Sequence, residues 1–201
     1  MKRAGYYYYE QAGALHAELK REIPIERLKQ LHEKRPARHL AIALRQLLLL
    51  VACPILIYLF PVWWVQLPAA VLMGFVVFSF TVLLHEAVHK CIFKQDPHNL
   101  NWKLGMLYGT LSGLAASQFN RWHLDHHNNL GSTTADPKRA YLSPKRNARW
   151  FKLLYMTPAL FPIYFRAAAK ANAGYPPELQ KRIKKERVLS MGLHIGWAVF
   201  C

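Results

Sequence analysis

A stretch of 39 residues without Asp, Glu, Lys or Arg, residues 46–84, limits the possible folds more than any other feature of the sequence. A bilayer core about 30 Å thick needs roughly 20 helical residues for each crossing, so this stretch is long enough for two. The prolines and paired tryptophans at 61–68 predict a turn between two helices at the level of the lipid headgroups. The alternative is a buried hairpin in a soluble core, but soluble helices rarely lack a polar face.

Basic residues lie on both sides of this stretch. The chain carries 27 Lys and Arg against 11 Asp and Glu, which gives a formal net charge of +16. Ten of the basic residues lie at or before Arg45, seventeen follow Leu84, and none lies in the predicted turn. The positive-inside rule therefore predicts that both ends of the hairpin are cytoplasmic and that the turn is outside. We interpret the excess positive charge as part of a cytoplasmic surface that contacts anionic membrane lipids. No nucleic-acid partner is expected, because the sequence carries no motif for one.

The sequence thus predicts an all-α integral membrane protein, a helical bundle with a hairpin and interfacial helices. Residues 1–40 are expected to form a cytoplasmic or interfacial segment, in which Pro24 starts a short helix. Residues 41–201 are expected to form a partial membrane domain. The apolar stretch 188–201 predicts a third span that is cut, so we expect a fragment of a longer protein.

Two shorter apolar segments, 104–117 and 153–165, have basic residues on both sides. Neither is long enough to cross a bilayer, so we expect the first to be re-entrant or interfacial and the second to lie in the interface. In the first segment Gly105, Gly109 and Gly113 recur every four residues, which predicts close contact with another helix.

Five of the ten histidines form two clusters beside the apolar segments. The first is HEAVH at 85–89, where the second predicted span ends, and the second is HLDHH at 123–127. Residues i and i+4 of a helix share one face, with Cβ atoms roughly 5–6 Å apart, so each cluster can present imidazoles to a metal ion. Imidazoles without cysteine suit zinc, copper, iron or nickel. Their number exceeds what one tetrahedral zinc uses, which favours two metals.

The first cluster also matches HExxH, the signature of zinc metalloproteases. In that interpretation His85 and His89 bind zinc, and Glu86 is the general base that activates the metal-bound water. Such a site needs one further ligand rather than three, so the histidines of the second cluster would have no role.

The motifs HEAVH and WHLDHH, followed by NNLGSTTADP, resemble the first and second histidine boxes of membrane-bound fatty acid desaturases. Membrane di-iron oxygenases such as carotenoid hydroxylases and ketolases are similar. The resemblance implies two iron ions on the cytoplasmic side, with O₂ as co-substrate, that introduce a double bond into a lipid acyl chain. It also implies an electron donor such as a ferredoxin or a cytochrome. It indicates neither the acyl carrier nor the position of the double bond.

By this resemblance the iron ligands are imidazoles from both boxes: His85, His89, His123, His126 and His127. Glu86 and Asp125 lie inside the boxes, and we expect each to accept a hydrogen bond from the second N–H of a ligating imidazole. Ion pairs with Lys90 and Arg121 are the alternative for these two acids. Asp136 either resembles the acidic step that follows the second box in the family or caps a turn.

The sequence departs from the family at the third histidine box. After His127 the only histidine is His194, and five imidazoles are too few for two irons. We therefore expect an incomplete chain, with an inactive remnant that keeps the boxes as the alternative. His16, His32 and His39 lie among charged residues and are expected to be solvated rather than to bind metal.

Overall fold

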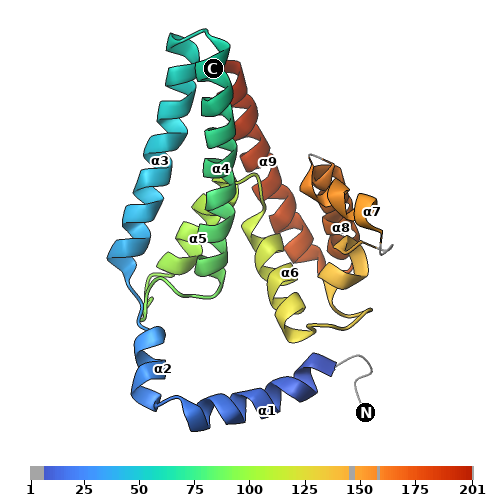
Figure 1. The fold of residues 1–201 in the computed structure, drawn as a ribbon. Coiled ribbons are helices and arrows are strands. Elements are labelled where there is room, and N and C mark those ends of the chain that lie inside the picture. The colour runs from blue at the N-terminus through green and yellow to red at the C-terminus, as the bar shows by residue number, and fades with distance from the viewer. Residues whose placement is uncertain (1–6, 145–147, 158, 201) are drawn as a thin grey trace. The chain divides into compact units, whose positions relative to one another are not determined.

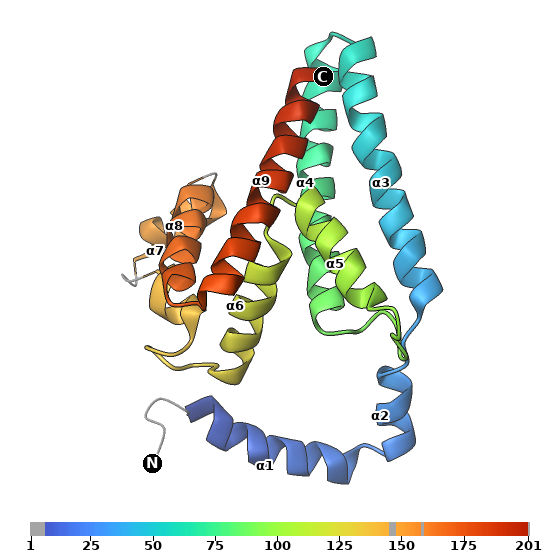
Figure 2. The ribbon, with the colours of Figure 1, turned by 180° about the vertical axis from the view of Figure 1, so that it is seen from behind.

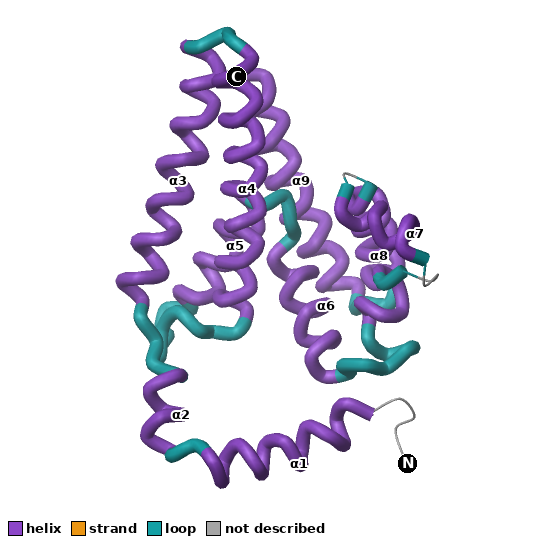
Figure 3. Tube along the Cα trace, in the orientation of Figure 1, coloured by secondary structure: helices purple, strands orange, loops and turns teal. Residues whose placement is uncertain are grey.

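Helices make up every element that the structure describes (Figure 3). The computed structural model describes residues 7–144, 148–157 and 159–200. Its elements are α1 (Tyr7–Glu22), α2 (Ile25–Leu31), α3 (Pro36–Leu59), α4 (Trp63–Val88), α5 (Leu100–Leu111), α6 (Ala116–Asn128), η1 (Lys138–Leu142), α7 (Arg149–Leu153), η2 (Leu154–Met156), α8 (Leu160–Ala173) and α9 (Pro177–Phe200). The all-α prediction is confirmed. The chain divides into two compact units, a hairpin unit (34–117 with 181–201) and a second unit (1–33 with 118–180).

The hairpin unit is built on α3 and α4, which pack against each other in antiparallel directions (Figures 1 and 2). Both helices are long and apolar enough to cross a membrane, and within the described residues no other helix meets that criterion. Val76 and Phe80 of α4 are buried, whereas many large apolar side chains, such as Leu48 and Phe75, point outward. An outer surface of this kind is what a hairpin surrounded by lipid requires, because lipid tails solvate apolar side chains.

The turn of the hairpin is shorter than predicted. Since α3 ends at Leu59 and α4 begins at Trp63, Pro68 lies inside α4 rather than in the turn. A proline removes one backbone hydrogen bond from a helix, but its fixed φ of about −65° is compatible with helical geometry, so Pro68 does not end α4. Trp63 and Trp64 are 70% and 62% exposed, as expected for indole rings at the lipid headgroups.

Glycine allows α5 to pack closely within the hairpin unit. A Cβ atom on Gly105 would lie 3.4 Å from the Cβ atom of Ala87 in α4, and one on Gly109 would lie 2.9 Å from the carbonyl oxygen of Leu114. The predicted close contact with another helix is therefore confirmed at Gly105, whereas Gly109 lies against the turn that follows α5. Gly113 has another role, because its φ of +78° places it in the left-handed region, in the turn that follows α5.

A buried carboxylate fastens the first half of α9 to the hairpin unit. Glu186 is 6% exposed, and its Oε2 accepts a hydrogen bond of 2.8 Å from the backbone N–H of Ser117, in the first turn of α6. Its Oε1 accepts hydrogen bonds from the Ser117 hydroxyl and from Nε of Arg182, the latter at 3.2 Å. The Arg182 guanidinium in turn lies 4.6 Å above the ring centroid of Trp102 in α5. Glu186 thereby caps the beginning of α6.

The first half of α9 contains the basic segment 181–187, and the helix continues from it without a break into an apolar segment. Val188, Met191 and Ile195 of this part are exposed, as side chains that face lipid would be. The apolar part alone is shorter than the roughly 20 residues that a crossing needs. A third span therefore stays a prediction.

In the second unit α6 packs against α8. Trp122 of α6 is buried against Ala167 and Ala168, and its ring stacks on that of Tyr164 with 5.3 Å between the centroids. The side-chain amide of Gln118 donates a hydrogen bond of 2.7 Å to the carbonyl oxygen of Ala168. These contacts fix the rotation of α6 about its own axis, and with it the directions in which the histidines of α6 point.

The shorter helices carry exposed apolar side chains. The helix α2 begins at Ile25, directly after Pro24, as predicted, and both Ile25 and Leu31 are exposed. The described residues of the segment 153–165 form the end of α7, η2 and the start of α8, and Met156 of η2 is 83% exposed. Exposed apolar residues are typical of helices at a membrane interface, but that location stays a prediction, as does a boundary after residue 40.

Candidate functional site

The first histidine cluster occupies the C-terminal end of α4. His85 lies in the last turn, and His89 is the residue that follows the helix as its C-cap. Their ring centroids are 4.7 Å apart in an edge-to-face arrangement, and their ligand nitrogens lie within 4.8 Å of each other. The HxxxH spacing thus brings the two imidazoles together on one face, where both are accessible.

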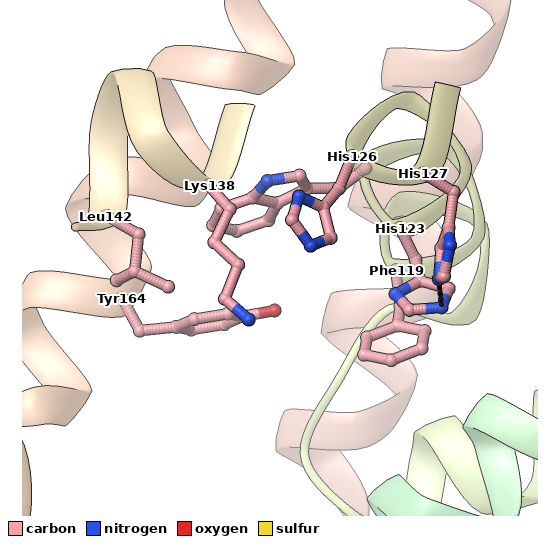
Figure 4. A pocket seen from close by; sticks show the side chains of 8 residues that line it. Phe119, His123, His126, His127, Lys138, Leu142 and Tyr164 are labelled. Carbon is pink, nitrogen blue, oxygen red and sulfur yellow. Dashed lines mark hydrogen bonds between the residues drawn. The ribbon is translucent and has the colours of Figure 1, made fainter. Parts of the chain in front are cut away.

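The second cluster gives a similar pair on α6. The Nε2 atoms of His123 and His127 are 3.0 Å apart, and the ring of His123 stacks on Phe119 with the ring planes 9° apart (Figure 4). At this distance one nitrogen donates a hydrogen bond and the other accepts it. The two Nε2 atoms are therefore close enough to each other to be two ligands of one metal ion.

His126 points in another direction and is fixed by a buried acid. Its Nδ1 lies 2.8 Å from Oδ1 of Asp136, which is fully buried. The same oxygen accepts a hydrogen bond of 2.9 Å from the backbone N–H of Lys138, so the carboxylate is held by the chain itself. An imidazole that donates its Nδ1–H to a carboxylate leaves Nε2 with a lone pair, the usual state of a metal-binding histidine. Asp136 caps the start of η1 and orients His126 at the same time.

The acid inside the second cluster has a different partner from the one expected. Oδ2 of Asp125 lies 2.8 Å from Nε of Arg121, one turn earlier on α6. This is the ion pair that the sequence offered as the alternative. The hydrogen bond from a box imidazole belongs to Asp136 instead, which the sequence identified only as a turn or an acidic step.

Glu86, inside the first cluster, is bonded to His39 of α3. Its Oε2 lies 2.6 Å from Nδ1 of His39. The expectation that His39 is solvated is wrong, because this side chain is only 5% exposed. It lies on the face of α3 that packs against α4, whereas its charged neighbour Arg38 is exposed. His32, by contrast, is exposed as predicted.

His194 lies in the hairpin unit, on the apolar part of α9. Its Nδ1 is 2.8 Å from the carbonyl oxygen of Ser190, one turn earlier in the same helix. This bond leaves Nε2 as the nitrogen that is available to a ligand, and a ligand role for His194 stays an open prediction.

A cavity of about 220 Å³ opens beside the second cluster, within the second unit (Figure 4). Most of its surface is apolar, and its lining includes Phe119, Trp122, His123, His126, Leu142 and Tyr164. Figure 4 shows the side chain of Lys138 running along the cavity toward Tyr164. The cavity therefore joins an apolar wall to the imidazole of His126.

Chemically, the described clusters offer imidazole nitrogen donors, and the Asp136 carboxylate orients one of the rings. Such donors suit divalent iron, zinc, copper and nickel. The pairing of His123 with His127 and the anchoring of His126 both fit a metal site on the second cluster. The pair on α4 fits one on the first.

A comparison with known protein families gives one finding. A family profile described as fatty acid desaturase matches residues 61–201, a range that includes both histidine clusters. No curated protein and no solved structure matches the chain.

Proposed function

Since this chain belongs to the fatty acid desaturase family, we propose that it is an O₂-dependent desaturase that introduces a double bond into an acyl chain carried on a lipid or on CoA. The family makes it an oxidoreductase with an acyl substrate. The single observation that carries the finer proposal is that both family boxes present imidazoles in ligand-like geometry, two by two, on the ends and faces of helices.

We assign the binding of two irons to the imidazoles of both boxes: His85, His89, His123, His126 and His127. Bound iron supplies the O₂-dependent removal of hydrogen from a methylene, for which no protein side chain has the reactivity. The chain contributes the donor set and the orientation of His126 by Asp136. Two irons require more ligands than these five imidazoles, so we assign the remaining positions to further ligand residues.

The cavity of the second unit supports an acyl substrate. A methylene group offers no polar handle, so its position must be set by the shape of an apolar wall. Trp122, Leu142 and Tyr164 supply such a wall, and His126 lies in the same cavity. We assign the cavity to the part of the acyl chain that is desaturated. We expect the two electrons that the reaction needs to come from a ferredoxin or a cytochrome.

The proposal is tested on the purified full-length protein, with a reducing system and deuterium-labelled acyl lipids or acyl-CoAs. We expect bound iron, and a product that has lost two hydrogens from adjacent carbons, as seen by mass spectrometry. A product that has gained oxygen would instead identify a hydroxylase of the same metal class. One bound zinc together with peptide hydrolysis would support the HExxH protease and overturn the proposal.

We further propose that the box histidines face the cytoplasm, because the basic residues flank the hairpin and avoid its turn. In a variant without the native Cys53, Cys91 and Cys201, a cysteine at Val62 should react with an impermeant maleimide added outside intact cells. A cysteine at the exposed Lys94 should react only after the cells are opened. Labelling of position 94 from outside would contradict this orientation.

A further inference from the structure

We propose that His39 and Tyr108 shape the first histidine box, with His39 as a positioning residue that acts through Glu86; the inference rests on the proposed function. Glu86 lies between the two metal-binding candidates of α4. His39 comes from α3 and Tyr108 from α5, so three helices of the hairpin unit meet at this carboxylate.

Both ring nitrogens of His39 have partners. Nδ1 lies 2.6 Å from Oε2 of Glu86, and Nε2 lies 3.0 Å from the hydroxyl oxygen of Tyr108. His39 is 5% exposed and Tyr108 is 1% exposed, and the Tyr108 ring stacks on Phe80 of α4 with 6.2 Å between the centroids. A buried, fully bonded imidazole of this kind holds the Glu86 carboxylate in one direction.

The phenol is suited to one arrangement of these hydrogen bonds. Burial and the negative charge of Glu86 raise the pKa of Tyr108 to about 12, so its hydroxyl keeps its proton and can donate it. With the hydroxyl as the donor, Nε2 of His39 accepts, and its Nδ1–H donates to Glu86. In this arrangement His39 carries its donated proton on Nδ1 and accepts on Nε2.

The first box needs such support because it lies at the end of a helix. Helix ends open more readily than helix centres, and a carboxylate in the last turn is opposed by the negative end of the helix dipole. His89, as the C-cap, depends on that turn. Lys34 adds a second contact, because its Nζ donates a hydrogen bond of 2.7 Å to the carbonyl oxygen of Lys90. Imidazoles held in a fixed orientation bind a metal ion more tightly than mobile ones.

The test is the affinity of the metal-free, full-length protein for ferrous iron alone, measured without oxygen by competition with a chelator. His39→Ala should lower this affinity about 10–100-fold. Tyr108→Phe should lower it less, since it removes one oxygen atom. His39→Asn should recover part of the loss, because its amide N–H can replace Nδ1–H. The matched control is His32→Ala, which should change nothing, because His32 is exposed and its Nδ1 lies 2.7 Å from the carbonyl oxygen of Leu28, far from the box in sequence.

A double-mutant cycle separates positioning through Glu86 from a general loss of structure. If His39 acts through Glu86, His39→Ala should lower iron affinity much less in the Glu86→Gln background than in the wild type. Additive losses would overturn the inference, and so would unchanged affinity in a folded His39→Ala or Tyr108→Phe variant. Where His39→Ala fails to fold, Tyr108→Phe decides. A wild-type protein that binds no iron would overturn the proposed function instead, so the two failures are distinguishable.

Discussion

Alanine at any one of the five box histidines is expected to abolish desaturation and to lower the iron content of the purified full-length protein. The variants are His85→Ala, His89→Ala, His123→Ala, His126→Ala and His127→Ala. Each variant replaces an imidazole, which donates a nitrogen to the metal, by a methyl group, which has no donor atom. The measurement combines product analysis with iron determination on protein of unchanged helix content.

Two other histidines serve as controls for this series. His32 and His98 are exposed, and His98 lies outside the helices, so alanine at either position should leave both iron content and activity unchanged. For His126 the structure also predicts the effect of changing Asp136, the acid that orients its ring. Asp136→Asn should reduce activity about 10–100-fold rather than abolish it, since it weakens the orientation of the His126 ring but keeps the ring itself. Full activity in any box variant would remove that histidine from the site.

Removal of the Glu186 carboxylate should strongly destabilise the hairpin unit. Glu186→Ala would leave the backbone N–H of Ser117 buried without its acceptor, and Ser117 itself is 4% exposed. An unsatisfied buried donor costs about 1–3 kcal/mol, and the Ser117 hydroxyl loses its acceptor at the same time. The free energy of unfolding, measured in mixed micelles by SDS titration, should therefore fall by at least this amount.

Lys185→Ala is the matched control, one residue earlier on the same helix. Lys185 is exposed, so its replacement should change the free energy of unfolding by no more than about 0.5 kcal/mol. Glu186→Gln should lie between the two, because the amide keeps one oxygen to accept from Ser117. Equal stability of the alanine variants at 185 and 186 would show that the buried carboxylate does not hold α9.

The membrane hairpin could be predicted from the sequence because a single physical property defines it. The absence of charge over residues 46–84 has few explanations, and α3 and α4 together contain nearly all of it, although α3 begins ten residues earlier, at Pro36. The end of the turn was missed, since a proline early in a helix and a proline in a turn look alike in a sequence. Only the positions of the backbone atoms show that Pro68 belongs to α4.

The histidine pairs were predictable for a similar reason: helical spacing alone decides which side chains of one helix meet. The partners that come from other helices were not. His39 looks solvated among basic residues, and nothing local indicates that it meets Glu86, 47 positions later. Asp125 lies inside the box but pairs with Arg121, whereas Asp136 lies outside it and holds His126. Contacts of this type depend on how helices pack, which periodicity does not encode.

The cap that Glu186 places on α6 has a consequence for how the protein is made. Ser117 leaves the ribosome 69 residues before Glu186 does. At a synthesis rate of roughly 5–20 residues per second, Glu186 is made several seconds after Ser117, and until then the first turn of α6 lacks this hydrogen-bond acceptor. During that interval the first turn of the helix that carries the second histidine cluster is uncapped, so a chain interrupted between Asn128 and Glu186 would display His123, His126 and His127 on a helix that is still free to unwind.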